Sequence, residues 1–248
     1  MRRILFLLVL SLGLSTPALA VEQVFDHTYP LSKGGSFSLE NVNGSVQVDG
    51  WEREEVEVVA VKTAHEDPAD AERVQIEVQA ANSNVSVHTR YPQNSGVDVA
   101  VEYHIHVPYR VLLGGVATVN GSVLIRGVQG NGWLRSVNGN VEVLNSTGRF
   151  SAHTTNGNLR LELLGLTDGD PVELSTVNGS VVLAVPSNAR ANLDVRSMNG
   201  DFLSELPVVS QGTFNARSFR GRLGSGGSAV SIRTVNGRIR VVTERAGI

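Results

Sequence analysis

Residues 150–161 read Phe-Ser-Ala-His-Thr-Thr-Asn-Gly-Asn-Leu-Arg-Leu, and this phrase decides the fold because the chain repeats it. Its general form is Φ-x-Φ-x-[S/T]-Φ-N-G-x-Φ-x-Φ, where Φ is apolar, and it occurs in eight copies. From the second copy onward, successive copies start 16 to 22 residues apart. Such a period is typical of stacked repeats, in which each unit buries its apolar face only against its neighbours. The copies begin at Phe37, Gly114, Gly132, Phe150, Val172, Leu193, Phe214 and Val230.

The side chains of the phrase change phase at its centre. Phe150, Ala152 and Thr154 share one strand face, whereas Leu159 and Leu161 continue with the opposite parity. A type I′ hairpin at Asn-Gly would explain this change, and so would a corner in a parallel β-solenoid. The residue before Asn is apolar in seven of the eight copies. In a hairpin it would face solvent, whereas at a solenoid corner it can point inward, so the pattern favours the solenoid.

We therefore predict an all-β protein. Its fold class is a parallel β-solenoid, similar to a β-helix, of about seven or eight short coils with an inserted antiparallel β region near the N-terminus. The insertion lies between Trp51 and Arg110, where three runs alternate apolar and polar residues in the manner of half-buried strands. These runs are residues 56–61, residues 74–78 with 85–87, and residues 97–107, and the polar residues 64–73 are expected to form a helical turn or a loop.

The first 20 residues have the pattern of a signal peptide. Arg2 and Arg3 precede the short apolar run 4–14, and Ala18-Leu19-Ala20 fits a cleavage site. We expect three regions: the signal peptide 1–20, an N-terminal β region 21–110 that includes the first repeat and the insertion, and the solenoid repeats 111–248. The mature chain should be periplasmic or extracellular, without a transmembrane segment. The absence of cysteine excludes a cysteine-linked lipid anchor and any disulfide.

Stacked coils would place the repeated Asn and Gly residues in columns, because neighbouring parallel strands lie ~4.8 Å apart. Asn side chains can bond to one another along such a column. Arg220 should interrupt the column, and Asn236 should resume it. We expect these residues to serve the backbone geometry. They are Asn43, Gly44, Asn120, Gly121, Asn138, Gly139, Asn156, Gly157, Asn178, Gly179, Asn199, Gly200, Asn236 and Gly237.

Charge is divided unevenly along the chain. Residues 22–110 carry 15 acidic and 6 basic residues, whereas residues 111–248 carry 9 acidic and 13 basic residues. The basic end suggests a surface for an anionic partner, although arginines on strands more often only solvate the surface. The candidate binding face consists of Arg220, Arg222, Arg238 and Arg240. The partners that we expect are an envelope protein, a glycan or an anionic membrane surface, with self-association as a further prediction and nucleic acid not expected.

Residue patterns that carry catalysis are scarce. The chain lacks a thiol nucleophile, the HExxH motif, the P-loop and the EF-hand signature. His104 and His106 share a strand face and would bind a metal only with a third ligand such as His88 or Glu102. The simpler interpretation is a polar strand face. We therefore predict no enzyme activity, no cofactor and no metal site.

The signal peptide, the strand end at Val107-Pro108 and the repeated TVNG-x-V phrases resemble the bacterial putative-adhesin family, a domain of unknown function with β-strand repeats. The resemblance covers roughly residues 21–242. It implies an extracytoplasmic β-solenoid, and it implies neither an enzyme activity nor catalytic residues.

Three functional hypotheses follow from the sequence. The first is a non-enzymatic exported envelope protein, an adhesin-like binding module with an elongated β-repeat surface. The second is a structural or self-assembling envelope-stress module that associates through the open ends of its coils, where backbone groups are unpaired. The third is a carbohydrate-active β-helix enzyme, which would need carboxylates paired on one sheet face.

Overall fold

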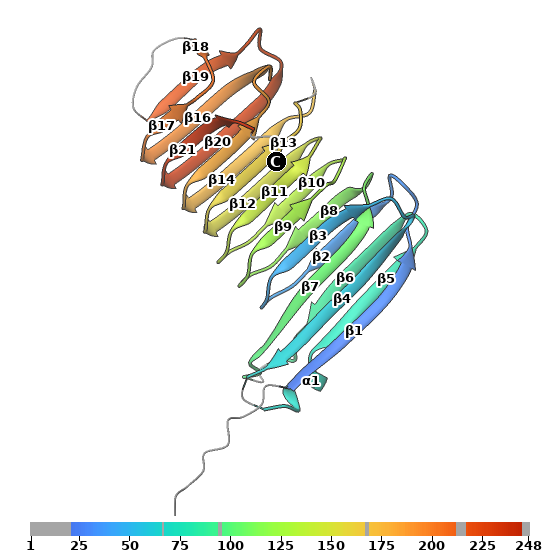
Figure 1. Cartoon of the computed structure of the whole chain (residues 1–248). Coiled ribbons are helices and arrows are strands. Elements are labelled where there is room, and N and C mark those ends of the chain that lie inside the picture. The colour runs from blue at the N-terminus through green and yellow to red at the C-terminus, as the bar shows by residue number, and fades with distance from the viewer. Residues whose placement is uncertain (1–20, 66, 94–95, 167–168, 212–216, 245–248) are drawn as a thin grey trace, which may run out of the picture.

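The computed structural model describes residues 21–65, 67–93, 96–166, 169–211 and 217–244, so the predicted signal peptide lies outside the described residues. The described residues form two sheets that face each other along an elongated molecule (Figure 1). No helix among these residues is long and apolar enough to cross a membrane.

We call the 10-stranded sheet sheet A and the 11-stranded sheet sheet B. In spatial order, sheet A contains β1 (Val21–Pro30), β4 (Glu55–Ala64), β7 (Val99–Pro108), β3 (Val46–Trp51), β9 (Val123–Arg126), β11 (Val141–Ser146), β13 (Leu159–Leu163), β15 (Val181–Val185), β21 (Ile239–Thr243) and β17 (Phe202–Ser204). Sheet B contains β18 (Val208–Ser210), β19 (Ser218–Leu223), β16 (Ala191–Asn199), β20 (Ser228–Asn236), β14 (Val172–Asn178), β12 (Phe150–Asn156), β10 (Gly132–Arg135), β8 (Leu112–Ala117), β2 (Ser36–Glu40), β6 (Asn84–Arg90) and β5 (Gln75–Ala81).

Each Asn-Gly phrase joins a strand of sheet B to a strand of sheet A, and the strands of phrases that are neighbours in the stack pair in parallel. In sheet A, for example, Leu159 lies opposite Val181 and Leu161 opposite Leu183. The two strands of one phrase, such as β12 and β13, therefore lie in different sheets. This arrangement excludes the hairpin alternative and confirms the prediction of an all-β solenoid with parallel sheets.

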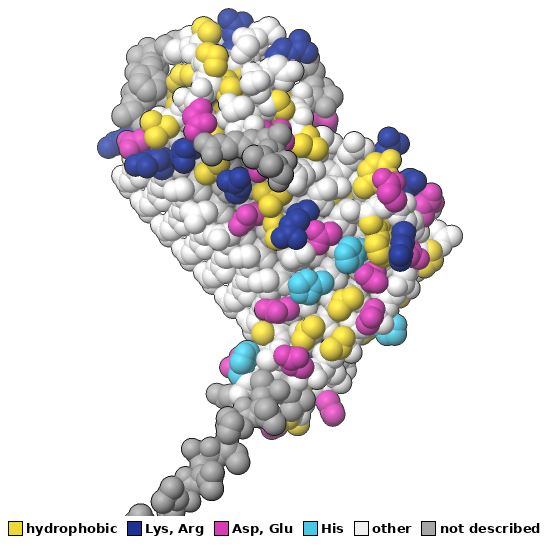
Figure 2. Space-filling view, in the orientation of Figure 1, with side chains coloured by type: hydrophobic (Ala, Val, Ile, Leu, Met, Phe, Trp, Pro, Cys, Tyr) yellow, Lys and Arg dark blue, Asp and Glu magenta, His cyan; other side chains and the backbone are white. Residues whose placement is uncertain are grey.

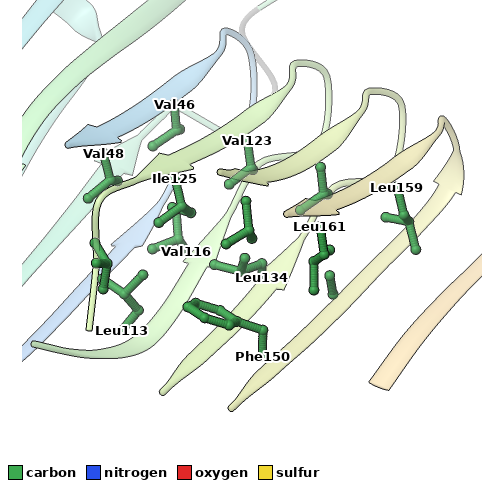
Figure 3. Packing of buried hydrophobic residues seen from close by; sticks show 14 of the residues in the cluster. Val46, Val48, Leu113, Val116, Val123, Ile125, Leu134, Phe150, Leu159 and Leu161 are labelled. Atoms are coloured by element: carbon green, nitrogen blue, oxygen red, sulfur yellow. The ribbon is translucent and has the colours of Figure 1, made fainter. Parts of the chain in front are cut away.

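The apolar residues of the phrase fill the space between the sheets (Figure 3). Phe150 and Leu134 point inward from sheet B, and Leu159, Leu161 and Ile125 point inward from sheet A; all five are fully buried. Because alternate residues of each strand face the core, a period-2 pattern of apolar residues on both sides of the corner is enough to build this interior.

The corner differs from the sequence expectation in one respect. The apolar residue before Asn points outward: Val119 is 38% exposed, Val177 41% and Met198 63%. The inward position belongs instead to the Ser or Thr that precedes it, and Ser136 and Thr176 are buried there. The inward direction that we predicted for the residue before Asn is therefore wrong, although the solenoid itself is confirmed.

The insertion extends both sheets beyond the first repeat. β7 pairs in parallel with β3, and β6 pairs in parallel with β2. β4 then pairs antiparallel with β7, β1 with β4, and β5 with β6. The polar segment before β5 contains the short helix α1 (Asp70–Arg73), whose Ala71 is buried. The strands predicted from sequence correspond approximately to four of these elements: residues 56–61 to β4, 74–78 to β5, 85–87 to β6 and 97–107 to β7.

The stacking order of the coils departs from their order in the sequence. The last phrase, β20 with β21, lies between β14–β15 and β16–β17. β20 pairs in parallel with β14 on one side and with β16 on the other. Sequence periodicity shows which segments stack but contains no information about their order.

The first residues of the copy that begins at Phe214 lie outside the described residues. Its described part, β19, pairs antiparallel with the edge of β16 instead of stacking in parallel as a coil. Arg220 thus lies opposite Asp194 and outside the column of asparagines. Phe219 of this strand is 5% exposed, and its ring stacks on that of Phe202 at a centroid distance of 4.9 Å, which closes the C-terminal end of the core.

Candidate interaction surface

Seven asparagine side chains form a continuous ladder at the corner. Asn156 donates from Nδ2 to Oδ1 of Asn138 at 2.9 Å, and Asn178 donates in the same way to Asn156 at 2.8 Å. The predicted ladder is therefore present, but Arg220 does not interrupt it. In stacking order the ladder consists of Asn43, Asn120, Asn138, Asn156, Asn178, Asn236 and Asn199.

The inward Ser or Thr of the phrase donates a hydrogen bond to the neighbouring coil. Thr154 Oγ1 donates to the carbonyl oxygen of Gly139 at 2.8 Å, and Thr176 Oγ1 donates to that of Gly157 at 3.0 Å. In the first coil Asn41 takes this place, and its Nδ2 donates to the carbonyl of Val101 at 2.9 Å. Buried hydroxyl and amide groups need such partners because burial without a hydrogen bond is costly.

The repeated glycine is required by the close approach of neighbouring coils. A Cβ at Gly157 would collide with the carbonyl oxygen of Gly139, and a Cβ at Gly179 would collide with that of Gly157. The same is true of Gly121, Gly139, Gly200 and Gly237 toward their own neighbours. The Asn and Gly residues thus have a clear structural role, and their polar groups are largely used within the ladder.

The polar residues after glycine are also used internally. The backbone N–H of Asn158 donates to Asn140 Oδ1 at 2.9 Å, and that of Ser180 donates to Asn158 Oδ1 at 2.8 Å. The corner therefore presents to solvent mainly a row of valines beside amides that bond to one another. This edge offers few unpaired groups to a ligand.

The four predicted arginines do not share one face. Arg220 and Arg222 lie on β19 in sheet B, whereas Arg240 lies on β21 in sheet A and Arg238 directly precedes β21. Figure 2 shows lysines and arginines around the C-terminal end and also over the N-terminal strands, with histidines toward the N-terminal end. The four predicted arginines are thus divided between the two sheets.

A groove lies on the outer face of sheet A, over β13, β15, β21 and β17. Its floor contains Val182, Val242 and the buried Ala184, and this hollow encloses about 300 Å³. A second hollow of about 510 Å³ adjoins it and shares Val182 and Arg240 with it. Small side chains on β15 stand between long ones on the neighbouring strands, and this difference in length makes the groove. We call the two hollows together the sheet-A groove.

Three arginines and three carboxylates line the sheet-A groove. Their nearest nitrogen–oxygen distances are 3.0 Å for Arg160–Glu162, 3.2 Å for Arg240–Glu205 and 4.0 Å for Arg238–Asp201. The side chains of Arg160, Arg240 and Arg238 are about half exposed, at 48%, 48% and 58%. Since exposed ion pairs contribute only ~0–1 kcal/mol each, these side chains can exchange their partner for a ligand. The groove as a whole is electrically balanced.

The candidate metal pair of histidines lies far from one of its expected partners. His106 and His104 lie on β7 in sheet A, whereas His88 lies on β6 in sheet B, where its Nδ1 is 3.1 Å from Glu40. His106 stacks on Trp51 at a centroid distance of 5.0 Å and contacts Glu57 at 2.8 Å. Among the described residues, no three His, Cys, Asp or Glu side chains are grouped so that they could hold a metal ion.

None of the described groups whose pKa is shifted lines the sheet-A groove. Burial raises the pKa of Tyr91 and of Tyr103 to about 12, and the hydroxyl of Tyr103 is hydrogen-bonded to Thr89 at 2.7 Å. Burial also lowers the pKa of His153, which lies on sheet B. These groups are explained by packing. None of them supplies a proton at the sheet-A groove.

A family model described as Toastrack DUF4097 matches residues 33–242. The chain is also similar to the solved structure of a "putative cell adhesion protein" from Clostridium sporogenes ATCC 15579, with a TM-score of 0.53, 9% identity, and coverage of 91% of this chain and 100% of that one. A "putative adhesin" from Bacteroides fragilis NCTC 9343 gives a TM-score of 0.43 at 11% identity, with coverage of 89% and 97%. No curated protein matches by sequence. At such identities, the first likeness shows a shared fold.

Proposed function

Starting from the finding that the chain belongs to the Toastrack DUF4097 family, we propose that it is an exported, non-enzymatic binding module of the cell envelope. Its ligand is an uncharged glycan, and the sheet-A groove holds it. Two features support export and binding: the signal-peptide pattern of residues 1–20 and the extended surface of the stacked coils (Figure 1). The solved structure with the same fold is named for cell adhesion.

The observation that carries the proposal is the combination of hydrogen-bond donors and acceptors around an apolar floor. Arg160, Arg238 and Arg240 supply N–H donors, while Glu162, Asp201 and Glu205 supply oxygen acceptors. Sugar hydroxyls both donate and accept, so they match such an array, and the C–H faces of a sugar ring can lie on Val182 and Val242. A binding site generally combines an apolar lining with a few placed polar groups.

The charge balance distinguishes a glycan from an anionic surface. Each arginine of the groove already faces a carboxylate. A phosphate or an anionic lipid headgroup would be attracted to the guanidinium groups and repelled by the neighbouring carboxylates at similar distance. A neutral ligand avoids this repulsion. The groove therefore favours the glycan over the anionic membrane surface.

The same pairing argues against the carbohydrate-active enzyme. A glycosidase needs one carboxyl group that is kept protonated in an apolar pocket beside a second, ionised one. Glu205 and Asp201 are exposed and lie beside guanidinium groups, and Glu162 contacts Arg160. The arrangement supports binding without hydrolysis.

The proposal is tested by calorimetric titration with a panel of probes. The neutral probes are short oligomers of N-acetylglucosamine and of glucose, and the anionic probes are heparin fragments and phosphatidylglycerol vesicles. We expect saturable binding of a neutral glycan that changes little with salt, because ionic screening acts on charged ligands. Binding of the anionic probes alone, or of none of the probes, contradicts the proposal.

Two matched variants compare an arginine of the sheet-A groove with an arginine of sheet B. Arg240→Gln removes a cation from the groove, whereas Arg220→Gln removes one from sheet B. We expect at least a tenfold loss of glycan affinity for Arg240→Gln, which corresponds to ~1.4 kcal/mol, and no change for Arg220→Gln. Equal losses for both variants would place the ligand elsewhere.

A further inference from the structure

The two ends of the solenoid are closed differently. At the C-terminal end the edge strands β17 and β18 have three residues each, and Phe202 and Phe219 cover the core. Short edge strands protect a sheet from further pairing. At the N-terminal end, sheet A finishes with β1, a regular strand of ten residues. Its pairing with β4 runs without a bulge from Val21 to Pro30.

The free edge of β1 presents an unbroken row of backbone groups. The N–H of Leu31 donates to Glu54, which continues the register that pairs Pro30 with Glu55. Because bonded residues alternate in an antiparallel pair, the odd-numbered residues of β1 bond to β4. The N–H and C=O groups of Glu22, Val24, Asp26 and Thr28 therefore point away from β4. Among the described residues no strand lies on that side.

The core is also incompletely covered at this end. Phe25 and Tyr29 of β1 lie opposite Ala60 and Val56, so they share the inner face, yet both remain partly exposed. Ile76 and Val78 on β5, the edge of sheet B, are likewise partly exposed. Apolar side chains and unpaired backbone thus occur together on the same end of the molecule, where a partner strand would cover both.

We propose that this end binds a second copy of the chain, with β1 pairing antiparallel to its counterpart about a twofold axis near Phe25. In this register Val24 faces Asp26 of the second copy, Gln23 faces His27, and Glu22 faces Thr28. No like charges are opposed, and the two Phe25 rings meet on the inner face. A shift that centres the axis on Asp26 would oppose two carboxylates, which is unfavourable.

The proposed contact joins two copies and leaves no edge for a third. A twofold contact uses the same surface on both partners and leaves no further β1 edge. Head-to-tail growth would need a matching strand at the other end, where β17 and β18 are too short. The dimer places the two sheet-A grooves at its far ends. The inference does not depend on what the grooves bind, and failure of glycan binding leaves it unaffected.

Single cysteines test the register, because the chain has no cysteine of its own. The backbone of Phe25 bonds to β4, so the two Phe25 residues form a non-hydrogen-bonded pair with Cα atoms ~4.5 Å apart, within the range that a disulfide needs. We expect Phe25→Cys to give a covalent dimer under mild oxidation. Thr28→Cys, which faces Glu22, serves as the control and should remain uncross-linked. Equal cross-linking of both variants overturns the proposal.

Val24→Pro tests the backbone pairing. Proline removes an N–H that points to the free edge, a position that an edge strand tolerates, whereas Val24→Ala retains it. The molar mass of the purified protein is followed against concentration by light scattering, with thermal unfolding as the check on folding. We expect monomers and dimers for the unmodified chain and Val24→Ala, and at least a tenfold higher dissociation constant for Val24→Pro. A monomer at all concentrations, an unchanged dimer in Val24→Pro, or growth beyond two copies overturns the proposal.

Discussion

The side chain of Asn236 donates a hydrogen bond of 2.8 Å to Oδ1 of Asn178, although 58 residues separate them in the chain. On its other side, Asn236 accepts a hydrogen bond of the same length from Asn199. The last phrase of the sequence is therefore an interior rung of the ladder. Its strands connect the coil of β14–β15 to that of β16–β17, so the C-terminal segment holds two earlier parts of the chain together.

This position predicts slow hydrogen exchange near the C-terminus. The amides of β20 and β21 should exchange as slowly as those of β12 and β14, because all four strands are paired on both sides. Those of β18, an edge strand of three residues, should exchange fast and serve as the internal control. Fast exchange of β20 would contradict the interior placement.

The glycine column predicts a steric effect of a single methyl group. Gly157→Ala should destabilise the protein by about 3 kcal/mol, because Cβ would collide with the backbone of Gly139. A methyl group at Gly165 would meet no other atom within 4 Å, so Gly165→Ala is the matched control and should be neutral or slightly stabilising. Urea unfolding measures both. Similar stability of the two variants would show that the coils can separate at little cost.

The inward hydroxyl of the phrase predicts a difference between two conservative changes. Thr176→Val should cost about 1–2 kcal/mol, since it removes a hydrogen bond from a residue that is 3% exposed. Thr176→Ser retains the hydroxyl, as Ser136 does naturally at its own corner, and should cost less. If both variants unfold at the same urea concentration, the hydroxyl does not stabilise the corner.

The solenoid could be predicted from sequence because its register is local to each phrase. Asn156 and Asn178 are at the same position in two copies, so parallel stacking brings them together whatever the details of the corner. The direction of Val177 was predicted wrongly, because the strand alternation continues up to the corner. Val172, Leu174 and Thr176 all face the core, so Val177 faces outward.

The candidate site was less predictable because it combines residues of different coils. Arg160, Arg240 and Glu205 come together only when β21 lies beside β15 and β17. The periodicity of the phrase does not give this order. It also placed Arg220 in a coil, whereas Arg220 lies on an antiparallel strand in the other sheet.

The buried tyrosines predict a loss of stability at high pH. Burial raises the pKa of Tyr103 from 10.0 to about 12, so the folded state retains a proton that the unfolded state has lost. Stability is then complete below about pH 10 and falls as the pH rises toward about 12. Tyr103→Phe cannot ionise and should show a shallower decline, measured by urea unfolding across this range. An unchanged slope would mean that Tyr103 does not contribute to it.

The most direct test of the proposed function is a hydrogen-exchange footprint of the protein with a neutral oligosaccharide that binds it. Bound ligand should slow exchange in β13, β15, β21 and the residues around Glu205, which surround the sheet-A groove. The strands of sheet B opposite them, β12, β14 and β20, should be unchanged. Protection confined to sheet B, or to the row of valines at the corner, would contradict the assignment of the groove as the binding site.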